Sequence, residues 1–130
     1  MSRKHLIRDY MTPRPVTVPA RATLEEALEL MDDHGLRHLP VEKDGYLAGV
    51  ISDRDIARAF SEPLALGRHS VETAMTPAPF TALPDSELGE VLDIMAANRM
   101  GSVVIQDAGK RVVGIFTTTD AVRVLSDLLE

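Results

Sequence analysis

Two polar segments of this 130-residue chain have the residue types and spacing to bind a phosphorylated or hydroxyl-rich small molecule. Residues 52–55 and 117–120 each contain a hydroxyl residue, two variable residues and an aspartate, after a glycine and two apolar residues. Hydroxyl groups and free backbone N–H groups at a helix start can bind a phosphate, and a carboxylate there can accept hydrogen bonds from both hydroxyls of a ribose. The same residue types are the preferred helix N-caps, so capping is the alternative. Because one cap needs a single such residue and residues 117–120 supply four, ligand contact is favoured.

Both segments belong to a sequence that occurs twice in the chain. Residues 11–17 read Met-Thr-Pro-Arg-Pro-Val-Thr, and residues 75–81 read Met-Thr-Pro-Ala-Pro-Phe-Thr. A long repeat of this kind indicates one structural unit that is present in two copies. We therefore assign residues 1–68 to a first repeat with an N-terminal segment and residues 69–130 to a second repeat, with residues 61–74 linking the two.

The composition is that of an ordinary folded protein, with 45% hydrophobic and 26% charged residues. A net charge of −6 argues against nucleic acid or an anionic membrane as a partner. The absence of cysteine excludes disulfides and thiolate chemistry. The charged N-terminus lacks the apolar core of a signal peptide, and no apolar run is long enough to span a membrane. We therefore expect a cytoplasmic protein.

Each repeat is expected to fold as β-α-β-β-α. The proline-bounded residues 15–19 and 79–84 are expected to be short strands, because proline fixes its own φ and biases the preceding residue towards extended backbone. A helix with one buried face should follow in each repeat, because apolar residues recur at helical spacing. These residues are Leu24, Ala27, Leu28 and Met31 in the first repeat, and Leu88, Val91, Leu92 and Met95 in the second.

The ends of these two helices carry different residues. Thr23 and Glu26 have the spacing of a capping box at the start of the first helix, and Gly35 is expected to end it. At the start of the second helix, Asp85 or Ser86 is expected to be the cap.

Two hairpins and two further helices complete the repeats. Residues 38–42 and 47–51 form the first predicted hairpin, and residues 102–106 and 112–116 form the second. A right-handed crossover makes the first two strands of each repeat parallel, and the third strand pairs antiparallel. We predict an α+β fold of two three-stranded sheets that pack face to face about a pseudo-twofold axis, because each sheet has one apolar face without helices. The last helix is expected to bury Ala121, Val122, Leu125, Leu128 and Leu129.

Metal binding and catalysis are weaker interpretations of this sequence. His34 and His38 are four residues apart, but a glycine and a proline interrupt a continuous helix and no third ligand is evident. Asp53 and Asp55 could act as a carboxylate pair, yet the second repeat has Thr118 in place of Asp53, and acidic residues are common at helix starts. No Walker loop, zinc-protease motif or nucleophile elbow occurs. We expect a binding protein, with no metal and no enzymatic activity.

The tandem pattern Met-Thr-Pro, then Leu-x-x-Ala/Val-Leu-x-x-Met, then Gly-x-x-Ser/Thr-x-x-Asp resembles a pair of CBS domains, also called a Bateman module. The resemblance covers about residues 9–128 and is to the stand-alone bacterial or archaeal type. It implies two related clefts that bind AMP, ADP, ATP or S-adenosylmethionine as regulatory ligands reporting the energy or metabolite state of the cell, with no obligatory cofactor. It also implies a homodimer in the form of a four-repeat disc, and an unidentified protein that the module regulates. A ligand-independent dimerisation module is the alternative.

The resemblance also assigns ligand contacts to individual residues. Asp55 and Asp120 match the ribose-binding aspartate of the family. The positions that face the phosphates match Ser52, Arg54, Thr117 and Thr119. The positions that hold the adenine match Thr12, Pro15, Val16, Leu36, Arg37 and His38 in the first repeat, and Thr76, Pro79, Phe80, Met100, Gly101 and Ser102 in the second.

In the family, each cleft tends to combine the aspartate of one repeat with the adenine-holding residues of the other. This pairs Asp120 with the cleft lined by Val16 and Leu36, and Asp55 with the cleft lined by Phe80 and Met100. Arg54 offers a fixed positive charge for phosphate in the Asp55 cleft, and Arg37 and His38 are expected in the Asp120 cleft. Of the two, we favour the Asp120 cleft for a phosphorylated nucleotide.

Overall fold

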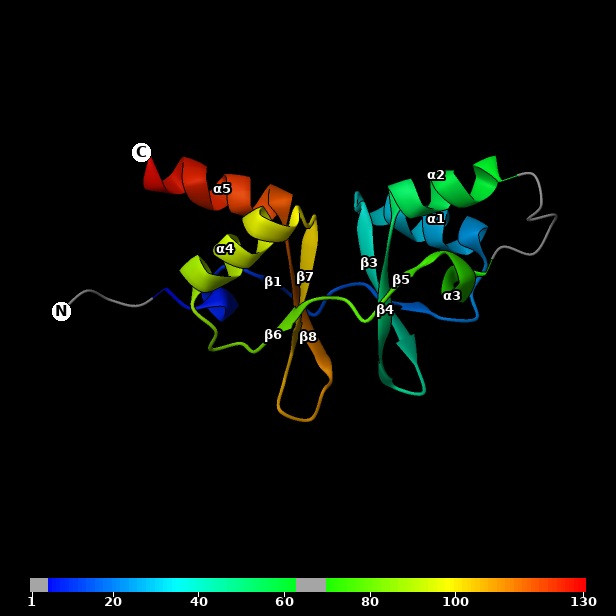
Figure 1. The fold of residues 1–130 in the computed structure, drawn as a ribbon, viewed down its shortest axis with the longest axis horizontal. Helices are drawn as coiled ribbons and strands as arrows, with labels where there is room; N and C mark the ends of the chain where they lie inside the picture. The colour runs from blue at the N-terminus through cyan, green and yellow to red at the C-terminus, as the bar shows by residue number, and fades with distance from the viewer. Residues whose placement is uncertain (1–4, 63–69) are drawn as a thin grey trace. The chain divides into compact units, whose positions relative to one another are not determined.

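The structure is a computed structural model that describes residues 5–62 and 70–130 (Figure 1). The elements in chain order are η1 Ile7–Asp9, β1 Thr12–Pro13, β2 Val18–Pro19, α1 Leu24–His34, β3 His38–Lys43, β4 Tyr46–Ser52, α2 Asp53–Ser61, α3 Val71–Ala74, β5 Thr76–Pro77, β6 Thr81–Ala82, α4 Leu88–Asn98, β7 Ser102–Gln106, β8 Val112–Thr117 and α5 Thr118–Leu128. In the part of the chain that is described, none of these helices has the length and apolar character needed to cross a membrane.

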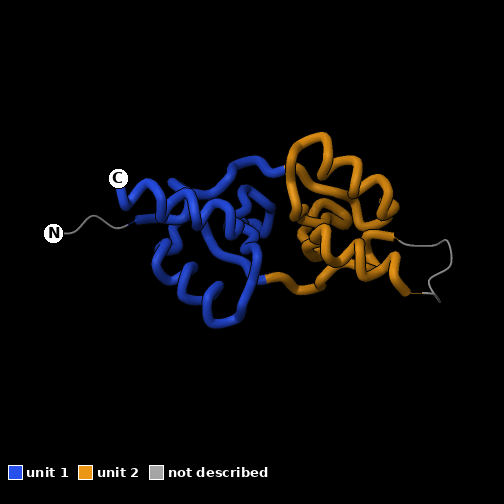
Figure 2. Tube along the Cα trace, turned by 90° about the horizontal axis from the view of Figure 1, so that it is seen from above, with its two compact units in different colours: residues 1–15, 80–130 blue, residues 16–79 orange. Residues whose placement is uncertain are grey.

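The chain forms two compact units (Figure 2). Unit 1 contains Met1–Pro15 and Phe80–Glu130, and unit 2 contains Val16–Pro79. These boundaries follow contacts in space, so they differ from the repeat boundaries at residues 68 and 69, which follow the sequence. The predicted link lies partly outside the described residues, and its last residues form α3 in unit 2.

Each unit has one four-stranded sheet, in the order β2-β3-β4-β5 in unit 2 and β1-β8-β7-β6 in unit 1. The parallel pairs β2–β3 and β6–β7 and the antiparallel hairpins β3–β4 and β7–β8 confirm the predicted strand directions.

The prediction of three strands per sheet was wrong. The Met-Thr-Pro segments form the additional strands, β1 antiparallel to β8 and β5 antiparallel to β4. These strands are two residues long, and their sequence shows no alternating apolar pattern that would have predicted them.

The predicted apolar faces of α1 and α4 are confirmed as parts of two separate cores. Leu24, Ala27 and Met31 of α1 are buried in the core of unit 2. Leu88, Val91 and Met95 of α4 are buried in the core of unit 1. That core also contains Ile7 from η1 and Phe116 from β8, both fully buried.

The predicted cap of α1 at Thr23 is confirmed, although only the Thr23 half of the capping box forms and no bond from the Glu26 side chain to the Thr23 N–H accompanies it; the predicted cap of α4 is wrong. The Thr23 side chain accepts a hydrogen bond from the Glu26 backbone at 3.1 Å, and Gly35 ends α1 in the left-handed region with φ 65°. For α4 the N-cap is Glu87, without a side-chain cap bond. Ser86 instead accepts a hydrogen bond from the Leu83 backbone.

A long-range contact takes the place of the expected cap at α4. The first backbone N–H of the helix, at Leu88, donates to the His5 carbonyl at 2.8 Å, and the Ile7 N–H donates to the Ser86 carbonyl at 2.8 Å. Because the N-terminal segment satisfies a free donor of the helix, a local side-chain cap is not needed there.

The prediction that α5 buries five apolar residues was wrong. Asp120 and Val124, which lie four residues apart on the inner face of the helix, are buried instead, and Ala121 is half-buried. The apolar side chains that face outward are Val122, Leu125, Leu128 and Leu129, with exposed fractions of 65%, 57%, 66% and 78%. Because Asp120 and Val124 define the inner face of α5, these apolar residues, which are spaced three and four positions from one another, lie on its outer face.

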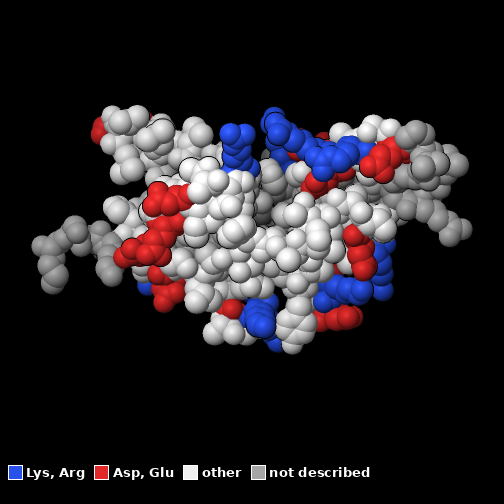
Figure 3. All heavy atoms as spheres, in the orientation of Figure 1, with Lys and Arg blue, Asp and Glu red and all other residues white. Residues whose placement is uncertain are grey.

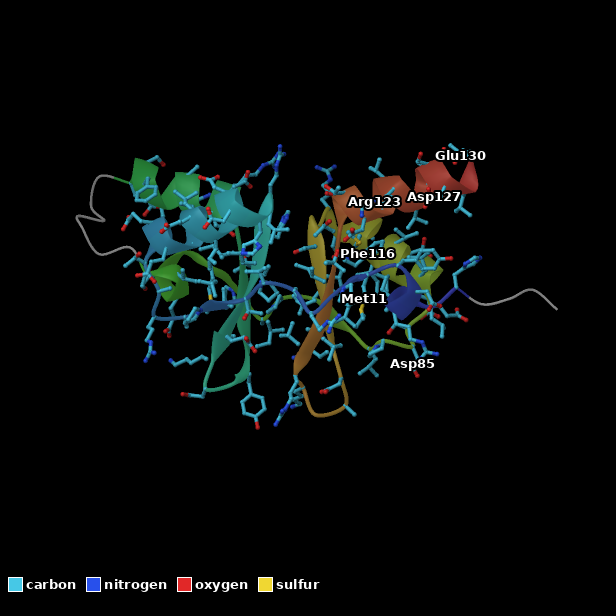
Figure 4. All side chains as sticks on the ribbon, turned by 180° about the vertical axis from the view of Figure 1, so that it is seen from behind. Met11, Asp85, Phe116, Arg123, Asp127 and Glu130 are labelled. Atoms are coloured by element: carbon cyan, nitrogen blue, oxygen red, sulfur yellow. The ribbon has the colours of Figure 1, made fainter. Side chains whose placement is uncertain are left out.

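A glycine in each central strand lets the Met-Thr-Pro strand approach closely. A Cβ placed on Gly49 of β4 would lie 2.6 Å from Met75 Sδ and 2.6 Å from the Thr76 carbonyl oxygen. A Cβ on Gly114 of β8 would overlap the Met11 side chain, which lies beside β8 in Figure 4. Glycine is therefore required at these two positions because another chain segment occupies the space of a side chain.

We predict that Gly49→Ala lowers the free energy of unfolding by about 1–3 kcal/mol, because overpacking a close contact forces strand β5 away from β4. Gly89→Ala is the matched control, since its Cβ would meet no atom within 4 Å and alanine is favoured over glycine in a helix by about 1 kcal/mol. Urea unfolding of the two variants measures both effects. Equal stability of Gly49→Ala and the parent protein would contradict the close-approach interpretation.

Candidate functional site

The two Ser/Thr-x-x-Asp segments lie where the last hairpin strand of each unit passes into a helix. Ser52 ends β4 and is the N-cap of α2, and Thr117 ends β8 and is the N-cap of α5. Both starts are capping boxes. In α2, the Ser52 N–H donates to Asp55 Oδ2 at 2.9 Å and the Asp55 N–H donates to Ser52 Oγ at 3.1 Å. In α5, the equivalent distances between Thr117 and Asp120 are 2.9 and 3.4 Å. The capping role that the sequence left as an alternative is therefore present in both units.

Each aspartate uses one carboxylate oxygen for its cap, and the other oxygen faces different groups. Asp120 is only 6% exposed, and its Oδ1 lies 3.5 Å from Thr12 Oγ1 and 3.4 Å from Arg123 Nη1. Both distances are at the long end of the hydrogen-bonding range. Oδ1 therefore retains capacity to accept a stronger hydrogen bond from a ligand.

Thr12 reaches Asp120 through strand pairing. Thr12 in β1 pairs with Ile115 in β8, two residues before the cap of α5. In unit 2, Thr76 in β5 pairs in the same way with Val50 in β4. The structure thus places two predicted ligand residues, Thr12 and Asp120, in contact within one unit although they are far apart in the sequence.

Arginine residues three positions after each aspartate were not predicted as site residues. Arg123 Nη1 lies 3.4 Å from Asp120 Oδ1, and Arg58 Nη1 lies 3.9 Å from Asp55 Oδ1. Figure 4 labels Arg123 near the start of α5. The repeated spacing Asp-x-x-Arg is the sequence feature that identifies both, because residues three apart lie on one helix face.

The loop before β3 lies beside the start of α2. The Asp53 N–H donates to the Arg37 carbonyl at 3.0 Å, and His38 is the strand partner of Ser52. Unit 1 has the same backbone arrangement, with Thr118 donating to the Gly101 carbonyl at 3.1 Å and Ser102 paired with Thr117. The predicted residues at these loops and helix starts therefore come together in each unit.

His38 has mixed electrostatic surroundings. Burial lowers its pKa below the ordinary value of 6.5, the Asp53 and Asp55 carboxylates raise the pKa, and the Arg37 and Arg54 guanidiniums lower it further. The result is a lowered pKa, so the imidazole is neutral at pH 7. His34, by contrast, is in the last turn of α1 and exposed.

The predicted site residues divide between the two units. Unit 2 contains Val16, Leu36, Arg37, His38, Ser52, Arg54, Asp55, Thr76 and Pro79, and unit 1 contains Thr12, Pro15, Phe80, Met100, Gly101, Ser102, Thr117, Thr119 and Asp120. The expected pairing of Asp120 with Val16 and Leu36, and of Asp55 with Phe80 and Met100, joins residues of different units and stays a prediction.

Comparison with known proteins identifies the family. A model of the CBS domain matches residues 7–62 and 71–127. The L-aspartate semialdehyde sulfurtransferase of Methanocaldococcus jannaschii is 33% identical over 119 residues, which are 91% of this chain and 23% of that protein. The chain thus spans less than a quarter of the length of this relative.

Solved structures of CBS pairs have the same fold. The structure of CBSX2 in complex with AMP has a TM-score of 0.85 and 25% identity, covering 97% of this chain and 99% of that one. The CBS domain pair of protein MJ0100, in complex with 5′-methylthioadenosine and S-adenosyl-L-methionine, has a TM-score of 0.86 and 30% identity, covering 96% and 98%. The α+β fold, the repeated sequence and these matches agree, and the chain belongs to the CBS domain family as a tandem pair.

Proposed function

We propose that this protein is a regulatory module that binds an adenosyl ligand, either AMP, ADP, ATP or S-adenosylmethionine, without converting it. The observation that supports the proposal most is the Asp120 carboxylate. It is buried, one oxygen is held by the cap of α5, and the other has only long contacts with Thr12 and Arg123. A ribose hydroxyl that donates to this oxygen would gain a charge-assisted hydrogen bond.

Two solved relatives support the choice of ligand class, since one binds AMP and the other binds 5′-methylthioadenosine and S-adenosyl-L-methionine. We place the protein in the cytoplasm and expect it to act on a partner protein. Binding regulates such a partner only if the ligand has different affinities for two states of the module.

Isothermal titration with AMP, ATP and S-adenosylmethionine tests the proposal. We expect binding to weaken by about 10- to 100-fold in Asp120→Asn or Asp55→Asn, because a hydrogen bond to a charged group contributes about 1.5–3 kcal/mol. Asparagine keeps an oxygen for the helix cap, so the fold should be preserved.

Asp53→Asn is the control for Asp55→Asn, since it removes the same charge from the same helix start, and the Asp53 side chain accepts a hydrogen bond from the Arg54 backbone N–H at 2.9 Å and takes no part in the capping box. Its affinity should match that of the parent protein. Absence of binding heat with all three ligands, or unchanged affinity in both Asp120→Asn and Asp55→Asn, would contradict the proposed function.

A ligand-independent dimerisation module is a second candidate, and the outer face of α5 favours it. Val122, Leu125 and Leu129 are exposed there at a spacing of three and four residues, which makes a continuous apolar stripe on a helix. The apolar faces of α1 and α4, by contrast, are already buried in the cores of their own units. We propose that a second copy of the chain covers the α5 stripe.

We predict that Leu125→Glu converts a homodimer to a monomer in light scattering, because a charge would have to be buried in an apolar interface. Leu83→Glu is the control, since Leu83 is similarly exposed at 50% and lies outside α5. A dimer that forms equally with and without nucleotide would favour this candidate over regulation by a ligand. A monomeric parent protein, or a Leu125→Glu variant that still dimerises, would contradict it.

A further inference from the structure

Two methionines, Met11 and Met75, lie at equivalent positions, directly before the added strands of the two units. The Met75 Sδ lies 2.6 Å from the point that a Cβ on Gly49 would occupy. In unit 1, Met11 Sδ is the atom nearest to the corresponding point on Gly114, and the Met11 Cγ and Cε carbons lie farther away, at 3.0 and 3.1 Å. In both units, therefore, the sulfur itself fills the space over the glycine.

The backbone alone attaches the added strands weakly. β1 and β5 have two residues each, and the second residue of each is a proline, which has no N–H to donate to the sheet. In unit 1 the next N–H, at Arg14, donates to the Val113 carbonyl at 3.1 Å. The Met11 and Met75 side chains pack against the apolar cores of their units. Methionine packing therefore contributes a large share of the attachment of each strand.

The sulfurs of these two residues are also within reach of a small oxidant. In residues 5–62 and 70–130, Met31 and Met95 are buried, with exposed fractions of 3% and 5%. Met11, Met75 and Met100 are half-buried. The sequence has no cysteine, so methionine supplies the sulfur that a peroxide can oxidise. Oxidation of methionine to its sulfoxide is reversible, because there are reductases for both sulfoxide epimers.

A methionine sulfoxide cannot keep the contact with the glycine. Its oxygen is a further substituent on a sulfur that already fills the space over the backbone of β4 or β8. The oxygen is also a polar acceptor, and burying it in an apolar contact without a hydrogen bond is costly. On the face that Figure 3 shows, charged side chains gather over the helices and at the hairpin ends, and the surface over each sheet is mostly uncharged. The oxidised residue is therefore better solvated when the strand leaves the sheet.

We propose that Met11 and Met75 are sites of reversible oxidation by a hydroperoxide and that this oxidation releases β1 and β5 from their sheets. The sulfur lone pair attacks one oxygen of hydrogen peroxide, the O–O bond breaks, and an S–O bond forms. The proton of the transferred oxygen passes to the departing hydroxide, which leaves as water. The sulfur is oxidised and the peroxide is reduced, so no further reactant is needed. The proposal goes beyond ligand binding, since it assigns a chemical modification to residues that are not among the predicted ligand contacts.

Release of β1 also alters the candidate ligand site. Met11 is followed by Thr12, whose Oγ1 lies 3.5 Å from Asp120 Oδ1. A strand that leaves the sheet takes Thr12 away from this carboxylate, so oxidation of Met11 is expected to weaken the binding of AMP. This consequence rests on the proposed function, whereas the release of the strands does not.

Peroxide treatment of the folded protein tests the proposal, with the sulfoxides located by mass spectrometry of its peptides. We expect oxygen at Met11 and Met75 and none at Met31 or Met95. In hydrogen exchange followed by NMR, the Arg14 amide should exchange about 10- to 100-fold faster after treatment, because its acceptor lies on β8 and the sulfoxide disfavours the closed strand.

The same sheet provides an internal control. The Val104 N–H donates to the Phe80 carbonyl at 3.0 Å, at the edge of the sheet opposite to β1. Its exchange should be unchanged by peroxide. Subsequent treatment with methionine sulfoxide reductases of both specificities should return the exchange of Arg14 to its original rate.

Met11→Leu separates the sulfur from the packing, since leucine has a similar volume and cannot be oxidised. The Arg14 amide of this variant should not respond to peroxide. Met100→Leu is the matched control, because it removes another half-buried sulfur, and it should respond as the parent protein does. In urea unfolding, which reports on both units, peroxide should lower the midpoint of the parent protein and leave that of the double variant Met11→Leu/Met75→Leu unchanged.

Two results would overturn the inference. One is that Met11 and Met75 stay reduced under conditions that oxidise Met100, and the other is that peroxide accelerates the Arg14 amide equally in the parent protein and in Met11→Leu. Titration with AMP is a separate readout, in which peroxide should weaken binding to the parent protein and not to Met11→Leu. If AMP and the other adenosyl ligands do not bind the untreated protein, the proposed function fails, and hydrogen exchange still decides the inference.

Discussion

Both units depend on the contact between a Met-Thr-Pro segment and a glycine of the neighbouring strand. Met11 packs on Gly114 in unit 1, and Met75 packs on Gly49 in unit 2. At each contact the Met-Thr-Pro segment adds a fourth strand to a sheet whose other three strands come from a single repeat. The added strand comes from the segment that begins the other sequence repeat. A single repeat therefore cannot complete its own sheet, which is a physical reason for the duplication of the motif.

The same strand exchange builds the candidate ligand site. Strand β1 brings Thr12 to Asp120, and the capping box fixes Asp120 at the start of α5. The two oxygens of this carboxylate have different surroundings, because Oδ2 closes the capping box of α5 and Oδ1 faces Thr12 of β1 and Arg123 of α5. Stability and the proposed ligand binding are coupled at Asp120, since a substitution that removes the proposed ligand contact also alters the helix start. Substitutions that keep the cap oxygen are needed to separate the two roles.

Local patterns predicted the elements whose determinants are local. Residues at helical spacing predicted α1 and α4, and turn residues predicted both hairpins. Two of the errors occur where a distant segment decides the outcome. The His5 carbonyl, rather than Asp85 or Ser86, satisfies the start of α4, and two-residue strands such as β1 depend on a partner that the sequence does not reveal. In α5 the periodicity was correct but the buried face was not, because a polar residue, Asp120, occupies the inner side. Helical spacing identifies a stripe of apolar residues and does not determine whether the core or the outer surface receives it.

The residues that the two repeats share at their helix starts have structural roles, whereas the residues in which the repeats differ change the local charge. The shared residues of each helix start have backbone or packing roles: the glycine that admits a strand, the hydroxyl cap and the capping aspartate. Gly101 and Ser102 make the same backbone contacts as Arg37 and His38, since the Gly101 carbonyl accepts the Thr118 N–H and Ser102 pairs with Thr117. Substitutions that change the charge at such positions have little effect on the free energy of unfolding. A duplicated fold of this kind can therefore keep one architecture in both units while the two helix starts acquire different preferences for the charge of a ligand.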